Sequence, residues 1–352
     1  MSKFGYQVID ADGHGGEFAN WQEDVPERFK PTLAKYRERI KQHYGRLPLP
    51  GGGQARKGDR FDIRPGMNDP KLRLEDMDLE GIDVTVTFPG GAGEEWAMLD
   101  PEFSLALCQA VNNSKARFNK ECGGRVSSVA KLPMIDPQAA AKELRRAVTE
   151  LGLKGMVCTQ HVREKNLDHR DFDPVWAEAE RLGVAVCIHG GGQAPDQYPV
   201  CVDRFNTRLE VHAITHPVGN MVALDSFCVG GIIARFPKLK VAFMESGCGW
   251  LPFWLWRLDE HYEKMPEQAP NIDRKPSEYF YSNCFISCDP DEPMIPEVVK
   301  LCGDDRIIYA SDYYHWDCAF PDTVKLIAER NDLSDSTKKK ILGDNAKKLF
   351  PF

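Results

Sequence analysis

Short, mostly apolar segments alternate with amphipathic segments along most of this 352-residue chain. The apolar segments are rich in valine, isoleucine and phenylalanine and lack polar alternation, a pattern typical of strands buried on both faces. The pattern predicts strands at residues 7–14, 81–89, 125–134, 154–160, 183–191, 240–247, 280–288 and 306–315.

The segments between these strands have the spacing of amphipathic helices. In 136–152, Asp136-Pro137 offers an N-cap followed by a first-turn proline, and Leu144, Ala147 and Leu151 repeat at helical intervals. By the same reasoning we expect helices at residues 72–79, 102–122, 136–152, 174–182, 218–236, 249–265, 291–303 and 321–349.

This alternation predicts the fold class. Eight apolar strands, each followed by helix, fit a closed α/β (β/α)8 barrel of the TIM type. A doubly wound open sheet is the alternative, but no strand is followed by the G-x-G-x-x-G turn of its nucleotide-binding members. We therefore expect one barrel domain over residues 1–352, with a long insertion after the first strand.

The insertion covers residues 18–71 and is rich in glycine, proline and charged residues, most clearly in Leu47-Pro-Leu-Pro-Gly-Gly-Gly53. We expect it to pass over the top of the barrel as a lid or as a contact between subunits. The aromatic residues Trp250, Trp254 and Trp256 have helical spacing and predict core packing or a subunit interface, so a homo-oligomer, plausibly a dimer, is expected.

Charge and composition exclude several classes of protein. The net charge is -8 and no basic stripe is present, which argues against nucleic-acid binding. No apolar run approaches the roughly 18 residues that span a membrane, and the first residues lack the apolar core of a signal peptide. The eleven cysteines show no C-x-x-C spacing, so we expect core thiols in a reducing cytoplasm.

Metal-binding side chains stand at the end of the first strand. Asp12 and His14 are two residues apart, so on a strand they share one face and converge on one point. A carboxylate beside an imidazole suits zinc, iron or manganese, and Gly13 between them would let a ligand approach. A polar strand end before a glycine-rich turn is the alternative interpretation of this stretch alone.

Three further predicted strands also end in a histidine or a carboxylate side chain. His189 ends the fifth predicted strand, Glu245 the sixth and Asp312 the eighth. In a (β/α)8 barrel the active site lies at the carboxyl ends of the strands. Four strand ends with an imidazole or a carboxylate therefore predict a metal site.

Three more histidines lie close to these strand ends in sequence. His212 and His216 precede Pro217 and are expected on a loop above strand five, and His315 follows Asp312 by three residues. Either they bind metal, or they contact substrate or support other ligands. If they bind metal, the site has more ligands than one zinc ion needs and would suit a non-heme di-iron centre.

These residues stand in motifs that resemble a known family. The chain is similar to the amidohydrolase superfamily, in the amidohydrolase-2 branch that includes the aminocarboxymuconate-semialdehyde decarboxylase-like enzymes. The motifs that carry the resemblance are Asp10-Ala-Asp-Gly-His14, Arg73-Leu-Glu-Asp-Met-Asp-Leu-Glu-Gly-Ile-Asp83, Phe236-Pro-Lys-Leu-Lys240, Glu245-Ser-Gly-Cys-Gly-Trp-Leu-Pro252 and Ser311-Asp-Tyr-Tyr-His-Trp-Asp317.

The resemblance implies Asp12, His14, His189 and Asp312 as metal ligands. The positions of Glu245, His216, His315 and His212 along the chain make them further candidates. The chain departs from the family in two ways. It has an aspartate where decarboxylase relatives often have histidine or glutamate, and it has Glu245 where several decarboxylases carry a catalytic histidine. The second departure weakens a direct transfer of their mechanism.

We therefore expect a metal-dependent enzyme acting on a small carboxylated or ring-derived molecule. Asp312, Glu245 and His216 are the predicted catalytic residues. In hydrolysis, a metal-activated water would attack the substrate and Asp312 would act as general base. In decarboxylation, the same metal would hold the substrate carboxylate. A di-iron monooxygenase that uses the surplus ligands is the alternative function.

Overall fold

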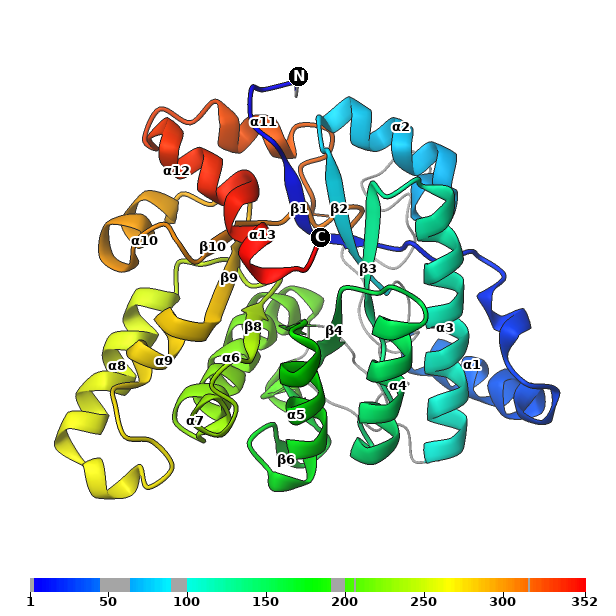
Figure 1. Ribbon diagram of the computed structural model, residues 1–352, viewed down its shortest axis with the longest axis horizontal. Helices are drawn as coiled ribbons and strands as arrows, with labels where there is room; N and C mark the ends of the chain where they lie inside the picture. Colours follow the sequence, from blue (N-terminus) through cyan, green and yellow to red (C-terminus); the bar gives the residue numbers. More distant parts are fainter. Residues whose placement is uncertain (1–2, 45–63, 90–99, 191–199, 206, 316) are drawn as a thin grey trace.

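The computed structural model describes residues 3–44, 64–89, 100–190, 200–205, 207–315 and 317–352. Eight parallel strands form the central sheet, and helices surround them (Figure 1). In spatial order the strands are β1 (Ile9–His14), β2 (Val84–Phe88), β3 (Val126–Ala130), β4 (Gly155–Cys158), β7 (Ala185–Ile188), β8 (Lys240–Phe243), β9 (Cys284–Cys288) and β10 (Ile307–Tyr309).

The sheet closes into a barrel between its first and last strands. The backbone N–H of Asp312 donates to the carbonyl of Asp12 at 2.9 Å, and Gly13 forms a parallel bridge with Tyr313. The predicted TIM-type barrel is therefore confirmed, and all eight predicted strands are present. Apolar strand residues are buried throughout, as in β7 and β9, because helices cover the outer face of the sheet.

The helices follow the predicted alternation, with shifted boundaries. They are α1 (Lys30–Tyr44), α2 (Pro70–Glu80), α3 (Pro101–Glu121), α4 (Pro137–Thr149), α5 (Asp173–Leu182), α6 (Arg208–Cys228), α7 (Ile232–Arg235), α8 (Leu251–Lys264), α9 (Pro276–Asn283), α10 (Ile295–Cys302), α11 (Thr323–Ala328), α12 (Asp335–Lys339) and α13 (Asn345–Leu349). Between α12 and α13, residues Lys340–Asp344 form a π-helical turn.

Two local predictions were wrong, and one small element was missed. The strand predicted at 280–288 begins only at Cys284, because Pro276 opens α9 and Asp259 accepts the N–H of Ser277 at 2.9 Å. The helix predicted at 321–349 is divided into shorter helices, since Ser334 caps a new start at α12. A small antiparallel pair, β5 (His161–Val162) and β6 (Lys165–Asn166), was not predicted.

Part of the insertion packs on the side of the barrel. Val25 and Leu33, before and within α1, join a small apolar cluster with Phe103 and Leu107 of α3. Residues 45–63 lie outside the described residues. The role of 18–71 as a lid or subunit contact stays a prediction.

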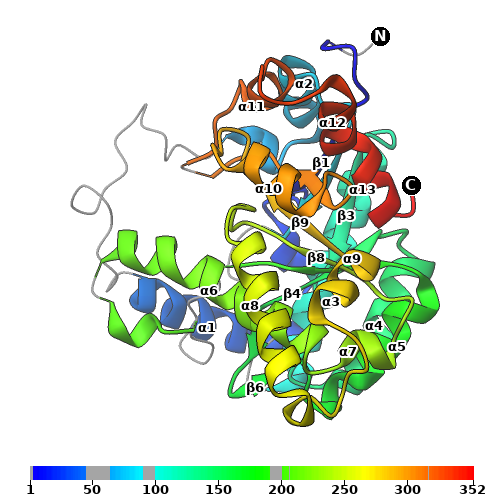
Figure 2. The ribbon, with the colours of Figure 1, turned by 90° about the vertical axis from the view of Figure 1, so that its left-hand side faces the viewer.

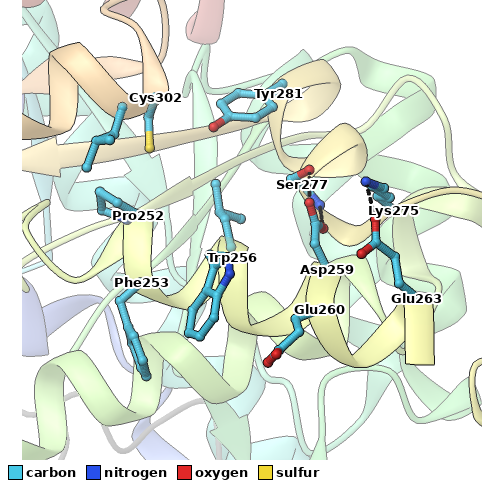
Figure 3. Close-up of a pocket in the computed structure, with 12 residues that line it drawn as sticks. Pro252, Phe253, Trp256, Asp259, Glu260, Glu263, Lys275, Ser277, Tyr281 and Cys302 are labelled. Atoms are coloured by element: carbon cyan, nitrogen blue, oxygen red, sulfur yellow. Dashed lines mark hydrogen bonds and ion pairs between the residues drawn. The ribbon is translucent and has the colours of Figure 1, made fainter. Parts of the chain in front are cut away.

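A groove of about 660 Å³ lies between α8, α9 and the end of α10 (Figure 3). Phe253 and Trp256 are 55% and 56% exposed there. At the other end, Glu263 pairs with Lys275. The subunit interface expected on this Trp-rich helix, like the dimer itself, stays a prediction.

Among the described residues, one segment could cross a membrane by length and composition alone, Leu209–Arg235. More than half of its most apolar window, 56%, is buried inside the protein, as in the core helix of a soluble protein. All eleven cysteines are free thiols, which agrees with the sequence-based expectation. The cytoplasmic location stays a prediction.

Candidate metal centre

β1 brings Asp12 and His14 to the inner edge of the barrel, where both are almost fully buried. Nε2 of His14 lies 3.7 Å from Oδ1 of Asp12. Gly13 has a different role from the one expected. A Cβ there would lie 2.5 Å from Nη2 of Arg73 and 2.7 Å from Oγ1 of Thr85. The glycine therefore lets neighbouring side chains pack against the strand.

Asp10, two residues before Asp12 on β1, supports this strand end. Its carboxylate accepts bonds from the hydroxyl of Thr85 at 2.7 Å, and from the N–H and hydroxyl of Ser311 at 2.9 and 2.8 Å. Burial raises the pKa of Asp10, although these donors and Arg73 oppose the shift. Arg73 also donates to the carbonyl of His14 at 3.1 Å.

His189 and Asp312 approach Asp12 and His14 from other strand ends. His189, directly after β7, places Nε2 3.5 Å from Oδ2 of Asp12. Its Nδ1 lies 2.8 Å from the carbonyl of Gly190, and donation there leaves the lone pair on Nε2. Oδ1 of Asp312 lies 3.0 Å from Nε2 of His14. The four ligands that the resemblance implies are therefore neighbours in space.

The facing atoms of Asp12, His14 and His189 fit one bound cation, and Asp312 adjoins them through His14. Both oxygens of Asp12, Nε2 of His14, Nε2 of His189 and Oδ1 of Asp312 are buried and make no hydrogen bond among the described residues. A buried polar atom without a partner costs about 1–3 kcal/mol. Two ligands that bind one ion at about 2.1 Å stand about 3 to 4.2 Å apart, and the separations here are 3.0 to 3.7 Å.

A second group of ligands gathers around Glu245, beyond the end of β8. Oε2 of Glu245 lies 3.2 Å from Nδ1 of His189 and 3.4 Å from Nε2 of His216. Oε1 lies 3.3 Å from Nδ1 of His315, which is 2.8 Å from Oδ1 of Asp312. All eight sequence-predicted site residues therefore belong to compact, overlapping groups of metal-binding side chains.

The positions of His212 and His216 differ from the prediction. Both lie on α6, because Thr207 and Glu210 form a capping box that starts the helix nine residues before His216. Pro217 sits inside this helix rather than at its start. The rings of His212 and His216 are 4.4 Å apart, on one face of α6.

The backbone turns sharply where the two carboxylates leave their strands. Glu245 has a φ of 51° and Asp312 a φ of 53°, both in the left-handed region. Such a conformation costs a residue other than glycine about 1–3 kcal/mol and is concentrated at functional sites. This turn of the backbone also explains why the strands predicted at 240–247 and 306–315 end early, at Phe243 and Tyr309.

The cluster is strongly polarised. Burial alone would raise the pKa of Glu245, but the facing imidazoles of His189 and His216 hold it well below its usual range. Burial disfavours the charged form of His189, yet Glu245 and Asp12 raise its pKa to about 10. In the described part of the chain, no lysine or arginine pairs with Asp12, Glu245 or Asp312. These carboxylates are therefore balanced by the facing imidazoles rather than by a lysine or an arginine.

A cavity of about 250 Å³ opens beside this cluster. Its wall includes side chains that the sequence reasoning missed, among them Asp289, Asp291 and Asp317. Asp289 directly follows β9, so the rule that strand ends carry the chemistry would have identified it. Figure 2 shows the barrel from the side on which α8 and α9 lie.

Comparisons with known proteins agree with this geometry. The family model described as Amidohydrolase matches residues 9–352. The chain is 30% identical to 2-amino-3-carboxymuconate-6-semialdehyde decarboxylase from Dictyostelium discoideum, over 79% of this chain and 75% of that protein. It is 25% identical to gamma-resorcylate decarboxylase from a Rhizobium species, over 81% of this chain and 87% of that protein.

A solved structure shares the fold. The 5-carboxyvanillate decarboxylase from Novosphingobium aromaticivorans, complexed with manganese and 4-hydroxy-3-methoxy-5-nitrobenzoic acid, superposes with a TM-score of 0.77 at 22% identity. The alignment covers 99% of this chain and 96% of that chain. At this identity the likeness supports the barrel.

Proposed function

This chain belongs to the amidohydrolase family, and we propose that it is a metal-dependent decarboxylase of a small organic acid. The observation that carries the proposal is the set of buried, unpartnered atoms on Asp12, His14, His189 and Asp312 at the barrel mouth. The relatives described above are decarboxylases by name, which favours loss of carbon dioxide over the other reactions of the family.

Asp12, His14, His189 and Asp312 would hold the ion. When bound, a divalent cation supplies positive charge that fixes an anionic oxygen of the substrate and stabilises charge that develops during the reaction. The ligand groups contain nitrogen and oxygen but no sulfur, which suits manganese, iron or zinc. We propose manganese, since a structure of the same fold binds it.

Asp312 is the proposed proton-transfer residue. Decarboxylation leaves an electron pair on carbon that takes up one proton, so an acid must stand next to that carbon. Asp312 lines the cavity, and its Oδ1 lies 2.8 Å from Nδ1 of His315. His315 would supply a proton to the carboxylate of Asp312, and Asp312 would deliver it to the carbon.

The cavity favours a small substrate. Its volume of about 250 Å³ is below the roughly 300–1,000 Å³ of pockets for drug-sized ligands. On the cavity wall, burial raises the pKa of Asp289 to about 7 and the pKa of Asp317 to about 6. We therefore propose a small, ring-sized organic acid as the substrate.

Two other reactions use parts of the same site. Hydrolysis would employ Asp312 as the base that removes a proton from water. A di-iron monooxygenase is favoured by one observation, the three overlapping ligand groups, of which two share Glu245 and two share His14. The products distinguish the three reactions. Decarboxylation releases carbon dioxide and needs no oxygen, hydrolysis releases an alcohol or an amine, and the monooxygenase reaction consumes oxygen and gives an oxygenated product.

The test is an anaerobic assay of manganese-loaded protein. The panel contains the substrates named for the relatives, 2-amino-3-carboxymuconate-6-semialdehyde, gamma-resorcylate and 5-carboxyvanillate, together with simpler hydroxybenzoates. Release of carbon dioxide without oxygen, absent in Asp312→Asn, supports the proposal. Turnover that requires oxygen, or hydrolysis of amides and esters with no carbon dioxide release, overturns it.

A further inference from the structure

We propose that the site binds two divalent ions, the second held by His212, His216 and Glu245 beside the ion at Asp12 and His14. This inference deepens the proposed function and rests on it for the first ion. Four observations support it: the histidine pair on α6, the separations between the ligand atoms, the contacts of Glu245, and the cavity that these residues line.

The helix α6 presents two histidines four residues apart. Residues at i and i+4 lie on the same helix face, an arrangement in which two histidines bind one metal ion. Nδ1 of His216 lies 3.0 Å from the carbonyl of His212, so donation there leaves the lone pair on Nε2. That nitrogen faces Oε2 of Glu245 at 3.4 Å.

The separations in this group fit one ion. One ligand atom from each of His212, His216 and Glu245 lies within 4.8 Å of the others. Ligands of one ion at about 2.1 Å stand about 3 to 4.2 Å apart, so closure of this group needs shifts of a few tenths of an ångström. Side chains of this length accommodate such shifts by small rotations.

Glu245 does not have the simpler role of orienting His189. A metal-binding histidine usually donates its second ring N–H to a carboxylate or carbonyl. In His189 the carbonyl of Gly190 takes that position at 2.8 Å, closer than Oε2 of Glu245 at 3.2 Å. The negative charge of Glu245 is therefore directed to the three imidazoles around it, and among the described residues it pairs with no lysine or arginine.

The second ion would stand on the wall of the cavity. His212, His216, Glu245 and Asp312 all line the cavity of about 250 Å³. Of the four residues assigned to the first ion, Asp312 is the one that lines it. Glu245 contacts His189 of the first group through Oε2 and His315 through Oε1. A substrate in the cavity would therefore contact the second ion, and it would reach the first group at Asp312.

The experiment counts bound manganese. Protein stripped with a chelator is titrated with manganese chloride, and bound metal is measured by equilibrium dialysis and electron paramagnetic resonance. We expect two ions per chain and a spectrum broadened by the coupling of neighbouring ions. The double variant His212→Ala/His216→Ala should bind one ion with a resolved six-line spectrum, and the exposed-residue control His169→Ala should bind two.

Each other outcome contradicts the proposal. Wild-type protein that saturates at one ion overturns it without reference to any variant or its folding. A double variant that still binds two ions shows that residues other than His212 and His216 hold the second ion. A folded double variant that binds neither ion contradicts the claim that the first ion has a site of its own. The metal count is independent of turnover, so failure of the decarboxylase assay leaves this test intact.

Discussion

Ser311 donates both its backbone N–H and its hydroxyl to the carboxylate of Asp10, 301 residues earlier in the chain. This pair joins the first and last strands of the barrel directly below the candidate ligands. Asp12 stands two residues after Asp10 on β1, and Asp312 directly follows Ser311, just past the end of β10. The alignment of the first metal group therefore depends on a contact between residues that bind no metal themselves.

Replacing Asp10 should weaken the metal site without touching a ligand. In Asp10→Ala the buried donors of Ser311 and Thr85 lose their acceptor, which should cost about 2–4 kcal/mol of unfolding free energy. Manganese affinity should fall about 10–100-fold, as for other residues that orient metal ligands. Urea unfolding and manganese titration measure the two effects.

Ser311→Ala is the matched control. It removes one hydroxyl and keeps the backbone donor to Asp10. The free energy of unfolding should therefore fall by about 1 kcal/mol. Equal losses in the two variants, or unchanged manganese affinity in Asp10→Ala, would contradict this role of the carboxylate.

Asp312→Asn should separate proton transfer from metal binding. The change removes the proton-transfer group and should lower the rate of carbon dioxide release by about 10²–10⁴-fold. Bound manganese should largely persist, because Asp12, His14 and His189 remain. Metal analysis beside the rate measurement checks this. A variant that loses its metal, and regains full rate with excess manganese, would show that Asp312 is only a ligand.

Removing the metal should lower thermal stability. Without the ion, the buried atoms of Asp12, His14, His189 and Asp312 that make no hydrogen bond lose the cation that would be their partner. At a free manganese concentration of about 100 times Kd, binding adds about 2.7 kcal/mol to the free energy of unfolding, or roughly 4 °C in Tm for a domain of 352 residues. Differential scanning calorimetry with and without chelator measures the shift; an unchanged Tm would argue against a bound ion.

The pH dependence of stability should include a contribution from Glu178 on α5. Hydrogen bonds from Arg181 and Arg145 lower the pKa of this buried carboxyl to about 2. Because the pKa is lower in the folded state, the stabilisation is present above the unfolded pKa near 4.5 and is lost as the pH falls towards 2. Since both arginines are half-exposed, we expect about 1–3 kcal/mol at pH 7.

The variant Glu178→Gln isolates this contribution. Its deficit against wild-type protein, measured by urea unfolding, should be largest at pH 6–7 and shrink below about pH 4. The exposed Glu164→Gln should show little deficit at any pH. A Glu178→Gln deficit that grows as the pH falls would contradict the sign of the shift.

The sequence was sufficient to predict the fold and most of the site. Buried parallel strands leave an unbroken apolar signal, and the carboxyl ends of such strands meet at one edge. That rule alone brings Asp12, His14, His189 and Asp312 together. The same rule applied to Asp289, after β9, would have added a residue of the cavity wall.

Other features of the site depend on effects that the local pattern conceals. Pro217 resembles a helix start, but the capping box of Thr207 and Glu210 begins α6 earlier and places His212 and His216 on one face. The left-handed backbone at Glu245 is maintained by surrounding contacts rather than by its residue type. The packing of Arg73 and Thr85 against Gly13 joins segments far apart in the sequence.

The most direct test of the central claim is an anomalous difference map from crystals of the protein grown with manganese. The account predicts a strong peak at the carboxyl ends of the strands, with Asp12, His14 and His189 as its ligands and Asp312 beside it. A map with no peak there, or with its strongest peak held by other residues, would contradict the assignment of these side chains as the metal centre.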